Sequence, residues 1–86
     1  MSDEPLEFPC EFPIKMMGRD QPEFHQAALS IVERHAGSVD ASAVRVAASS
    51  NGRFVSITVT INARSREQLD NIYRDLTGDE QILVAL

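Results

Sequence analysis

The sequence predicts an α+β domain in which two helices cover one face of a four-stranded antiparallel sheet. Its hydrophobic patterns follow the order strand, helix, strand, strand, helix, strand along 86 residues. Each predicted helix carries one apolar stripe, and both stripes must bury against the same sheet face, because parallel crossover connections are right-handed. Together these observations define a ferredoxin-like βαββαβ sandwich.

The first strand is predicted from Cys10 to Gly18, where apolar residues alternate with others. Pro13 lies inside it and has no N–H, so that position must face an unpaired side of the sheet or a bulge. In the helix that follows, Asp20 and Glu23 have the spacing of a capping box. Gly37 is expected to end this helix in the left-handed conformation. The apolar stripe between them consists of Phe24, Ala28, Ile31, Val32 and His35.

The second and third strands are predicted to form a hairpin. Asn51-Gly52 is the pair typical of a type I′ turn, and it follows an alternating strand at 43–48. In the returning strand one row of side chains is apolar and the other is polar, which predicts one buried and one open face. The apolar row is Val55, Ile57, Val59 and Ile61, and the polar row is Ser56, Thr58, Thr60 and Asn62.

The second helix is predicted to start at another capping box, formed by Ser65 and Gln68, and to end at Gly78. Its apolar stripe consists of Leu69, Ile72, Tyr73 and Leu76. The alternating residues Ile82, Val84 and Leu86 then predict a short last strand.

Strand parity places a mixed set of side chains on the sheet face that the helices leave open. Two of them are cations and three are apolar, a combination that suits a homo-oligomer contact or a weakly anionic ligand. An ordinary solvated sheet face fits the same pattern equally well. The set is Lys15, Met17, Arg45, Phe54, Ser56, Thr58, Thr60 and Leu83.

The charge is unevenly distributed along the chain. The formal net charge is −5 at pH 7, and four acidic residues fall within the first eleven, which contain no Lys or Arg. With two prolines they predict a mobile N-terminal arm at 1–9, ahead of a single domain at 10–86. The single Cys10 cannot form an internal disulfide, and the sequence has no signal-like or membrane-spanning stretch, so a cytoplasmic protein is expected.

No catalytic or metal motif in the sequence is strong. A copper or zinc site on this fold would need a Cys-x-x-Cys pair, which is missing. His25 and His35 would diverge by about 80° around a helix, and His35 is expected to contact the free carbonyls of the last helical turn. Arg19 and Asn62 lack the glycine-rich anion cradle that an acylphosphatase would need. No enzymatic activity, cofactor or metal is therefore predicted.

RNA binding is a competing interpretation, because an RNA-recognition motif has the same strand order. It would require several aromatic side chains on the open face, where only Phe54 qualifies. The residues after the acidic arm are also close to neutral in total charge. Nucleic acid is therefore not an expected partner.

Short motifs spread over almost the whole chain also carry a family resemblance. They are Leu6-Glu7-Phe8-Pro9, Phe12, Lys15, Met17-Gly18, Ser49-Ser50-Asn51-Gly52-Arg53-Phe54, Ser56-Ile57-Thr58-Val59, Glu67-Gln68-Leu69 and Tyr73-Arg74-Asp75-Leu76. In this order and length they resemble the YbeD-like family of small bacterial proteins of unknown function. The resemblance implies a ferredoxin-like domain similar to the ACT regulatory domains of amino-acid metabolism, and an association with lipoate metabolism.

In ACT domains the turn after the first strand carries a glycine and an Asp-Arg-Pro-Gly-like element that lines the effector site. Here Gly18, Asp20 and Pro22 fit that pattern, but Glu23 stands where a glycine would let an effector approach the backbone. Its carboxylate would repel an effector carboxylate. The favoured interpretation is structural: Asp20 and Glu23 cap the helix, and Gly18 permits the turn.

The sequence thus predicts a non-enzymatic regulatory or adaptor module that binds a protein partner or a small metabolite. A purely structural homo-oligomer without a ligand is the alternative. The candidate binding residues are Lys15, Met17, Arg45 and Phe54 on the open face, with Gly18 and Arg19 in the first turn.

Overall fold

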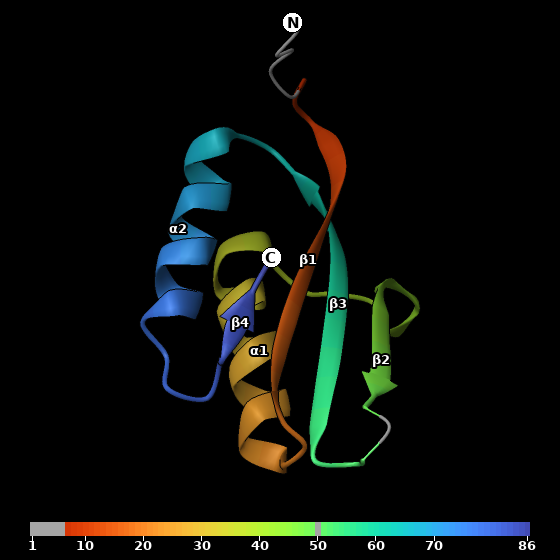
Figure 1. The fold of residues 1–86 in the computed structure, drawn as a ribbon. Helices are drawn as coiled ribbons and strands as arrows, with labels where there is room; N and C mark the ends of the chain where they lie inside the picture. Colours follow the sequence, from red (N-terminus) through yellow and green to blue (C-terminus); the bar gives the residue numbers. More distant parts are fainter. Residues whose placement is uncertain (1–6, 50) are drawn as a thin grey trace, which may run out of the picture.

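The computed structural model describes residues 7–49 and 51–86, and it confirms the predicted order of strands and helices (Figure 1). The elements are β1 (Cys10–Arg19), α1 (Pro22–Ala36), a short 3₁₀ turn η1 (Ala41–Ala43), β2 (Val44–Ala48), β3 (Phe54–Ala63), α2 (Arg66–Thr77) and β4 (Val84–Ala85). Phe8, at the end of the predicted arm, packs against the core. Residues 1–6 lie outside the described residues, so the mobility of the arm stays a prediction.

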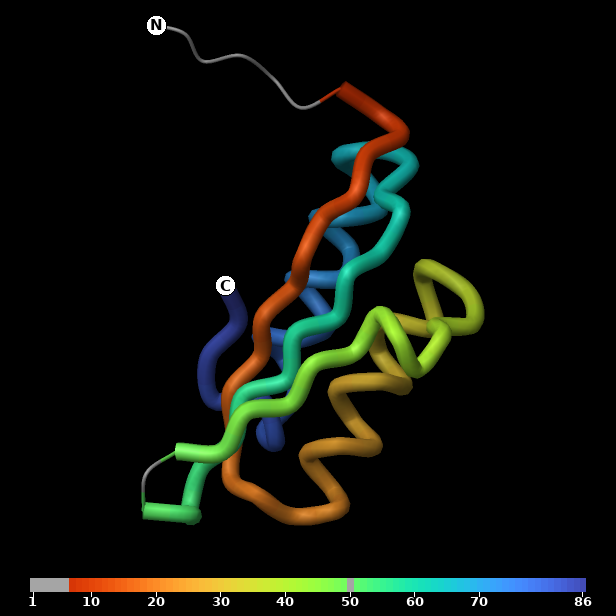
Figure 2. Tube along the Cα trace, turned by 90° about the vertical axis from the view of Figure 1, so that its right-hand side faces the viewer, coloured from red at the N-terminus to blue at the C-terminus, as the bar shows by residue number. Residues whose placement is uncertain are grey.

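The sheet is antiparallel throughout, with the strand order β2-β3-β1-β4. Both helices lie on one side of it; Figure 2 shows α1 beside the strands, with β2 turned toward the viewer. The core fills the space between the layers, and its largest fully buried side chains are Phe24, Ile14, Met16, Ile57, Ile72, Leu76, Val32, Val55 and Val59. The ferredoxin-like arrangement predicted from the hydrophobic patterns is therefore confirmed.

Pro13 lies where β1 has an unpaired side, as predicted. The N–H of Lys15 donates to the carbonyl of Leu86 over 3.2 Å, and the N–H of Leu86 donates back over 2.8 Å. Backbone groups of alternate residues in a strand point to the same side, so the nitrogen of Pro13 also points toward the β4 side. That position lies beyond the end of β4, and no ladder hydrogen bond is lost there.

The β2–β3 loop is longer than the predicted two-residue turn. The N–H of Ser49 donates to the carbonyl of Phe54 over 2.9 Å, and the N–H of Gly52 donates to the carbonyl of Ser49 over 3.1 Å. Gly52 has a φ of 73°, but no described residue other than glycine has a positive φ, so the type I′ turn is wrong. The side chain of Asn51 instead accepts the N–H of Arg53 over 3.0 Å. The strand register is nevertheless the predicted one, with Ala48 opposite Val55.

Gly52→Val is expected to lower the free energy of unfolding by at least about 1 kcal/mol, because a β-branched residue is strained at a φ of 73°. No atom lies within 4 Å of the position that a Cβ would take, so the strain is purely conformational. Gly52→Asn, which tolerates a positive φ, should lose clearly less stability. Urea melts of both variants decide the point. Equal losses would contradict a conformational origin.

The two ends of α1 differ from the predictions. Its N-cap is Gln21 and not Asp20, and no side chain caps it. Pro22 is the first helical residue, which requires an extended residue before it, and Gln21 has a φ of −150° and a ψ of 155°. At the other end Gly37 has a positive φ of 83°, but its ψ of −173° lies outside the left-handed helical region.

The predicted N-cap of α2 is confirmed, unlike that of α1. The hydroxyl of Ser65 accepts the N–H of Gln68 over 3.1 Å, which confirms the first half of the capping box. The side chain of Gln68 reaches back one residue further than predicted, to the N–H of Arg64 at 2.6 Å. Gly78 ends the helix in a right-handed conformation, with a φ of −86° and a ψ of −5°.

Candidate functional site

The sheet face away from the helices, here called the open face, is the main candidate site. The strand pairing sets Lys15 opposite Thr58, Met17 opposite Ser56, and Arg45 opposite Thr58, while their neighbours in sequence lie on the helix side of the sheet. The open face consists of Glu11, Pro13, Lys15, Met17 and Arg19 from β1, Arg45 and Ala47 from β2, Phe54, Ser56, Thr58, Thr60 and Asn62 from β3, and Val84 and Leu86 from β4 and the residue after it.

A row of two cations and a hydroxyl crosses the centre of this face. Lys15 and Arg45 stand on either side of Thr58, and both cations are exposed. Side chains directly opposite one another have Cβ atoms about 5 Å apart, so the Cβ atoms of Lys15 and Arg45 lie about 10 Å apart on either side of Thr58. With Arg19 and Glu11, the open face carries three cations and one carboxylate in a chain of net charge −5.

No carboxylate of the described residues lies within 4 Å of the charged nitrogens of these cations. All ion pairs found within 7–49 and 51–86 join Asp20 to His25 and Asp75 to Arg34 and His35. Lys15 and Arg45 therefore keep their charge available for an external group. A hollow of about 580 Å³ lies beside this row, lined by Glu11, Ser42, Ala43, Arg45, Thr58 and Thr60.

The other part of the open face is apolar. Met17 lies opposite Val84, whose exposed fraction is 42%, and Leu86 is 65% exposed opposite Lys15. Met17 and the half-buried Phe54 line a smaller hollow of about 150 Å³ with Ala47, Ala48, Ser49, Val55 and Ser56. The face thus combines an apolar strip with cations that form no ion pair with the described residues.

The predicted place of Leu83 on the open face is wrong by one residue. Ala85 pairs with the buried Met16, so Val84 and Leu86 face the open side, and Leu83 precedes the paired residues. Ile82 is buried because the turn before the strand directs it into the core: its N–H donates to the carbonyl of Asp79 over 3.1 Å. Because β4 pairs through only two residues, the alternation of apolar side chains in the sequence does not determine which of them face the core.

The two candidates in the first turn separate in the structure. Gly18 is buried on the helix side, where a Cβ would collide with Phe24 and the backbone of Gln81, so it has no surface for a ligand. Arg19 lies at the end of the open face and lines a hollow of about 290 Å³ with Gln21, Glu80, Gln81 and Leu83. The side-chain amide of Gln21 donates to that of Gln81 over 2.9 Å across this hollow.

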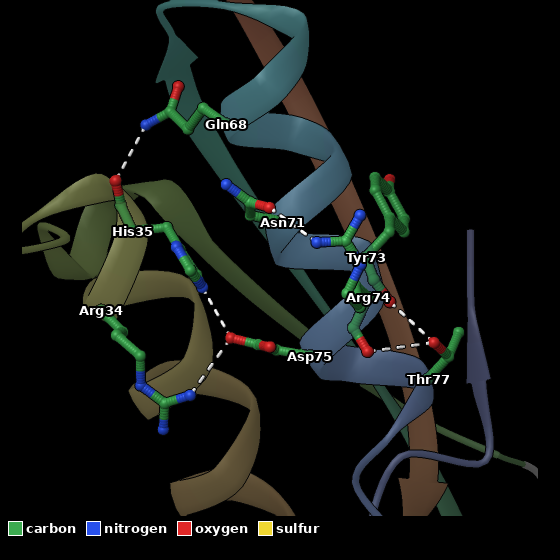
Figure 3. Close-up of polar contacts among 8 residues, drawn as sticks. All are labelled: Arg34, His35, Gln68, Asn71, Tyr73, Arg74, Asp75 and Thr77. Atoms are coloured by element: carbon green, nitrogen blue, oxygen red, sulfur yellow. Dashed lines mark hydrogen bonds and ion pairs between the residues drawn. The ribbon is translucent and has the colours of Figure 1, made fainter.

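A polar brace between the helices, which the sequence did not predict, lies on the other side of the molecule (Figure 3). The ring Nε2 of His35 is 2.6 Å from Oδ2 of Asp75, and Nη1 of Arg34 donates to the same oxygen over 3.2 Å. The expected contact between His35 and helix carbonyls is therefore wrong. The amide Nε2 of Gln68 donates over 3.0 Å to the carbonyl of His35, the last turn of α1.

These contacts lower the pKa of Asp75, first through the hydrogen bond from His35 and then through Arg34. Burial acts in the opposite direction and is outweighed. Because the folded-state pKa is the lower one, the stability that this brace contributes is present above the carboxyl's ordinary value of 3.8 and is lost as the pH falls below it. The brace is a structural element of the neutral-pH fold.

Within 7–49 and 51–86, no group of three or more His, Cys, Asp or Glu side chains is placed to hold a metal ion. Among the helices of those residues, none is long and apolar enough to cross a membrane. The His25 ring bonds to Asp20 over 3.2 Å and stacks edge-on against Phe24, with no nucleophilic side chain among its described contacts.

Fold and site together define a small ferredoxin-like α+β domain whose sheet face is uncovered. The solution structure of protein HP0495 from H. pylori has a similar fold, with a TM-score of 0.73 over 98% of this chain and 88% of that chain. The two sequences are 12% identical, so the similarity concerns the fold alone.

Sequence comparison identifies the family. The family model described as "Protein of unknown function (DUF493)" matches residues 3–86. A UPF0250 protein of Paraburkholderia phytofirmans is 49% identical over 81 residues, covering 94% of this chain and 91% of the relative. A UPF0250 protein of Nitrosomonas europaea is 44% identical over 87 residues and covers both chains completely. The chain therefore belongs to the DUF493, or UPF0250, family of small bacterial proteins of unknown function, and its resemblance to YbeD-like proteins is confirmed.

Proposed function

We propose that this protein is a non-enzymatic adaptor or regulatory module that binds an acidic segment of a protein partner on its open face. The observation that carries the proposal is the row of Lys15, Thr58 and Arg45, whose cations have no carboxylate partner among the described residues. The adjoining apolar side chains of Met17, Val84 and Leu86 supply surface that a partner would remove from water.

The charges favour a different protein over a second copy as the occupant of the open face. Two copies packed face to face would bring the central cations Lys15 and Arg45 of each copy toward the same cations of the other. An acidic segment would instead meet complementary charge. A small anionic metabolite beside Arg45 is the other outcome that the test distinguishes, and a cytoplasmic location and a role in lipoate metabolism stay predictions.

RNA is a poorer match to this face. Base stacking needs aromatic side chains, and among the described residues of the open face Phe54 is the aromatic one. Phe12 faces the helices, where its ring packs edge-on against Tyr73 with centroids 6.5 Å apart. The proposal therefore stays with a protein segment.

Arg45→Glu and Phe54→Ser test the proposal, because both side chains lie on the open face and outside the core. We expect each change to weaken capture of the partner from extracts of the native cell at least about tenfold, since aromatic and cationic side chains carry much of the energy of such interfaces. Capture should also weaken with added salt.

The matched control is Arg66→Glu, which makes the same charge change at an exposed residue on α2. This variant should retain the partners of the wild type, and circular dichroism should show all three variants folded. Native mass spectrometry reports any retained metabolite. Loss of the same partners in the control, or an unchanged partner set in both test variants, would reject the open face as the binding surface.

A further inference from the structure

The outer edge of β2 is left incomplete in the single chain. The carbonyl of Ala47 accepts the hydroxyl of Ser56, and the N–H of Ser49 donates to Phe54, so the backbone groups of these residues point toward β3. The groups of the alternate residues Val46 and Ala48 must then point outward. The described residues place no strand on that side, since β2 ends the sheet order (Figure 1).

The side chains of β2 are equally unusual. Val46 pairs with Ile57, which is 1% exposed, so both lie on the helix side of the sheet, yet Val46 is 55% exposed. The helices therefore cover β3 and leave the same face of β2 uncovered at Val46 and Ala48, while Val44 packs against the core. Strand edges in soluble proteins are usually protected by charged side chains, especially Lys, by Pro or by a bulge, and within residues 44–48 Arg45 alone is of this kind.

We propose that β2 pairs with β2 of a second copy of this chain, antiparallel and around a two-fold axis through Val46. In this register Val46 lies beside Val46 of the other copy, and each covers the other's exposed side chain. The outward N–H groups of Val46 and Ala48 would find the carbonyls of Val46 and Val44 across the axis. One contact thus satisfies both the open backbone edge and the exposed valine.

Charge supports this register over its nearest alternative. With Val46 on the axis, Arg45 lies opposite Ala47 of the other copy. A shift that places residue 45 on the axis would set Arg45 opposite Arg45, and like charges directly opposed across strands are unfavourable. The arrangement is isologous, so the two copies form a closed pair and not a fibre.

This pairing is independent of the proposed function, because it uses the strand edge and leaves the open face uncovered. It would join the two sheets so that the row of Lys15, Thr58 and Arg45 in one copy continues into Ala47, Ser56 and Met17 of the other. Because β2 has five residues, the contact is smaller than a standard interface, and dissociation at low concentration is expected.

Disulfide trapping tests the register. In a Cys10→Ser background, Val46→Cys places two thiols opposite each other at a Cα separation of about 5.5 Å, within the range that a disulfide bridges. Ala47→Cys is the matched control: its two copies would lie about 8 Å apart, beyond that range. Both positions are exposed, so both variants should fold. Under mild oxidation we expect Val46→Cys to form a covalent dimer roughly tenfold faster than Ala47→Cys.

Sedimentation velocity on the unmodified protein, from micromolar to near-millimolar concentration, should show a reversible monomer–dimer equilibrium. Val46→Pro removes an outward N–H without touching the bonds to β3, and it should shift this equilibrium to monomer. A wild-type protein that is monomeric at every concentration, or equal trapping of the two cysteine variants, would overturn the proposal. Neither result would bear on capture of a partner by the open face.

Discussion

Gly18→Ala is expected to lower the free energy of unfolding by about 3 kcal/mol, because the fold leaves no space for a methyl group there. A Cβ at this position would lie 2.7 Å from the carbonyl oxygen of Gln81 and 2.7 Å from Cε1 of Phe24. Phe24 is fully buried, so its ring cannot swing into solvent, and the clash with Gln81 involves backbone. Thermal and denaturant melts should show a melting temperature lowered by more than about 10 °C.

The control is Gly78→Ala, where the nearest atom to the added carbon is 3.4 Å away and the backbone is right-handed. It should change stability by no more than about 0.5 kcal/mol. The double variant Gly18→Ala/Phe24→Leu should lose less stability than the sum of the losses in the two single variants, because the smaller side chain at position 24 relieves the clash. If Gly18→Ala melts like the wild type, Gly18 is not a packing residue and the close approach of β1 to Phe24 and Gln81 does not require a glycine.

The fold could be predicted because its signals extend over many residues. In β3 the alternation of apolar and polar side chains continues for a ten-residue strand, and the structure buries Val55, Ile57, Val59 and Ile61 as predicted. The hairpin register also survived an error in the turn, because the longer loop pairs the same residues. Over a strand of this length the burial of one row of side chains fixes the register, and the conformation of a single turn does not change it.

Predictions that depended on a single residue were less successful. Asp20 has the side chain of an N-cap, but Pro22 fixes the start of α1 one residue later. The alternation of residues 82–86 assigns Leu83 to the open face, but this strand pairs through two residues only. The bond between His35 and Asp75 joins side chains 40 residues apart, a separation at which sequence spacing carries no information about contact.

The two sides of the sheet therefore have different roles in our interpretation. Between the sheet and the helices, side chains are buried or take part in the brace, in which His35 contacts Asp75 and Gln68 donates to the carbonyl of His35. On the open side, the cations of Lys15 and Arg45 have no acidic partner among residues 7–49 and 51–86. Variants of the helix side should thus change stability, and variants of the open side should change binding.

Gln68→Leu is expected to lower the free energy of unfolding by about 2 kcal/mol, the second largest effect. Gln68 is 9% exposed; its Oε1 accepts the N–H of Arg64 over 2.6 Å, and its Nε2 donates to the carbonyl of His35 over 3.0 Å. Leucine has a similar size but leaves the N–H of Arg64 without this acceptor. The carbonyl of His35 keeps only the bond from Nη2 of Arg64, at 3.2 Å.

Gln68→Glu separates the two hydrogen bonds by pH. An ionised carboxylate still accepts from Arg64 but would face the carbonyl of His35 with no donor, so the folded state raises the pKa of the introduced carboxyl. Its deficit relative to wild type should therefore be largest near neutral pH and should shrink as the pH falls through that raised pKa, where the protonated acid can donate to His35. Urea melts from neutral to mildly acidic pH, above the range in which Asp75 is protonated, measure this difference. A deficit that does not change with pH would show that the contact between Gln68 and His35 does not hold the last turn of α1 to α2.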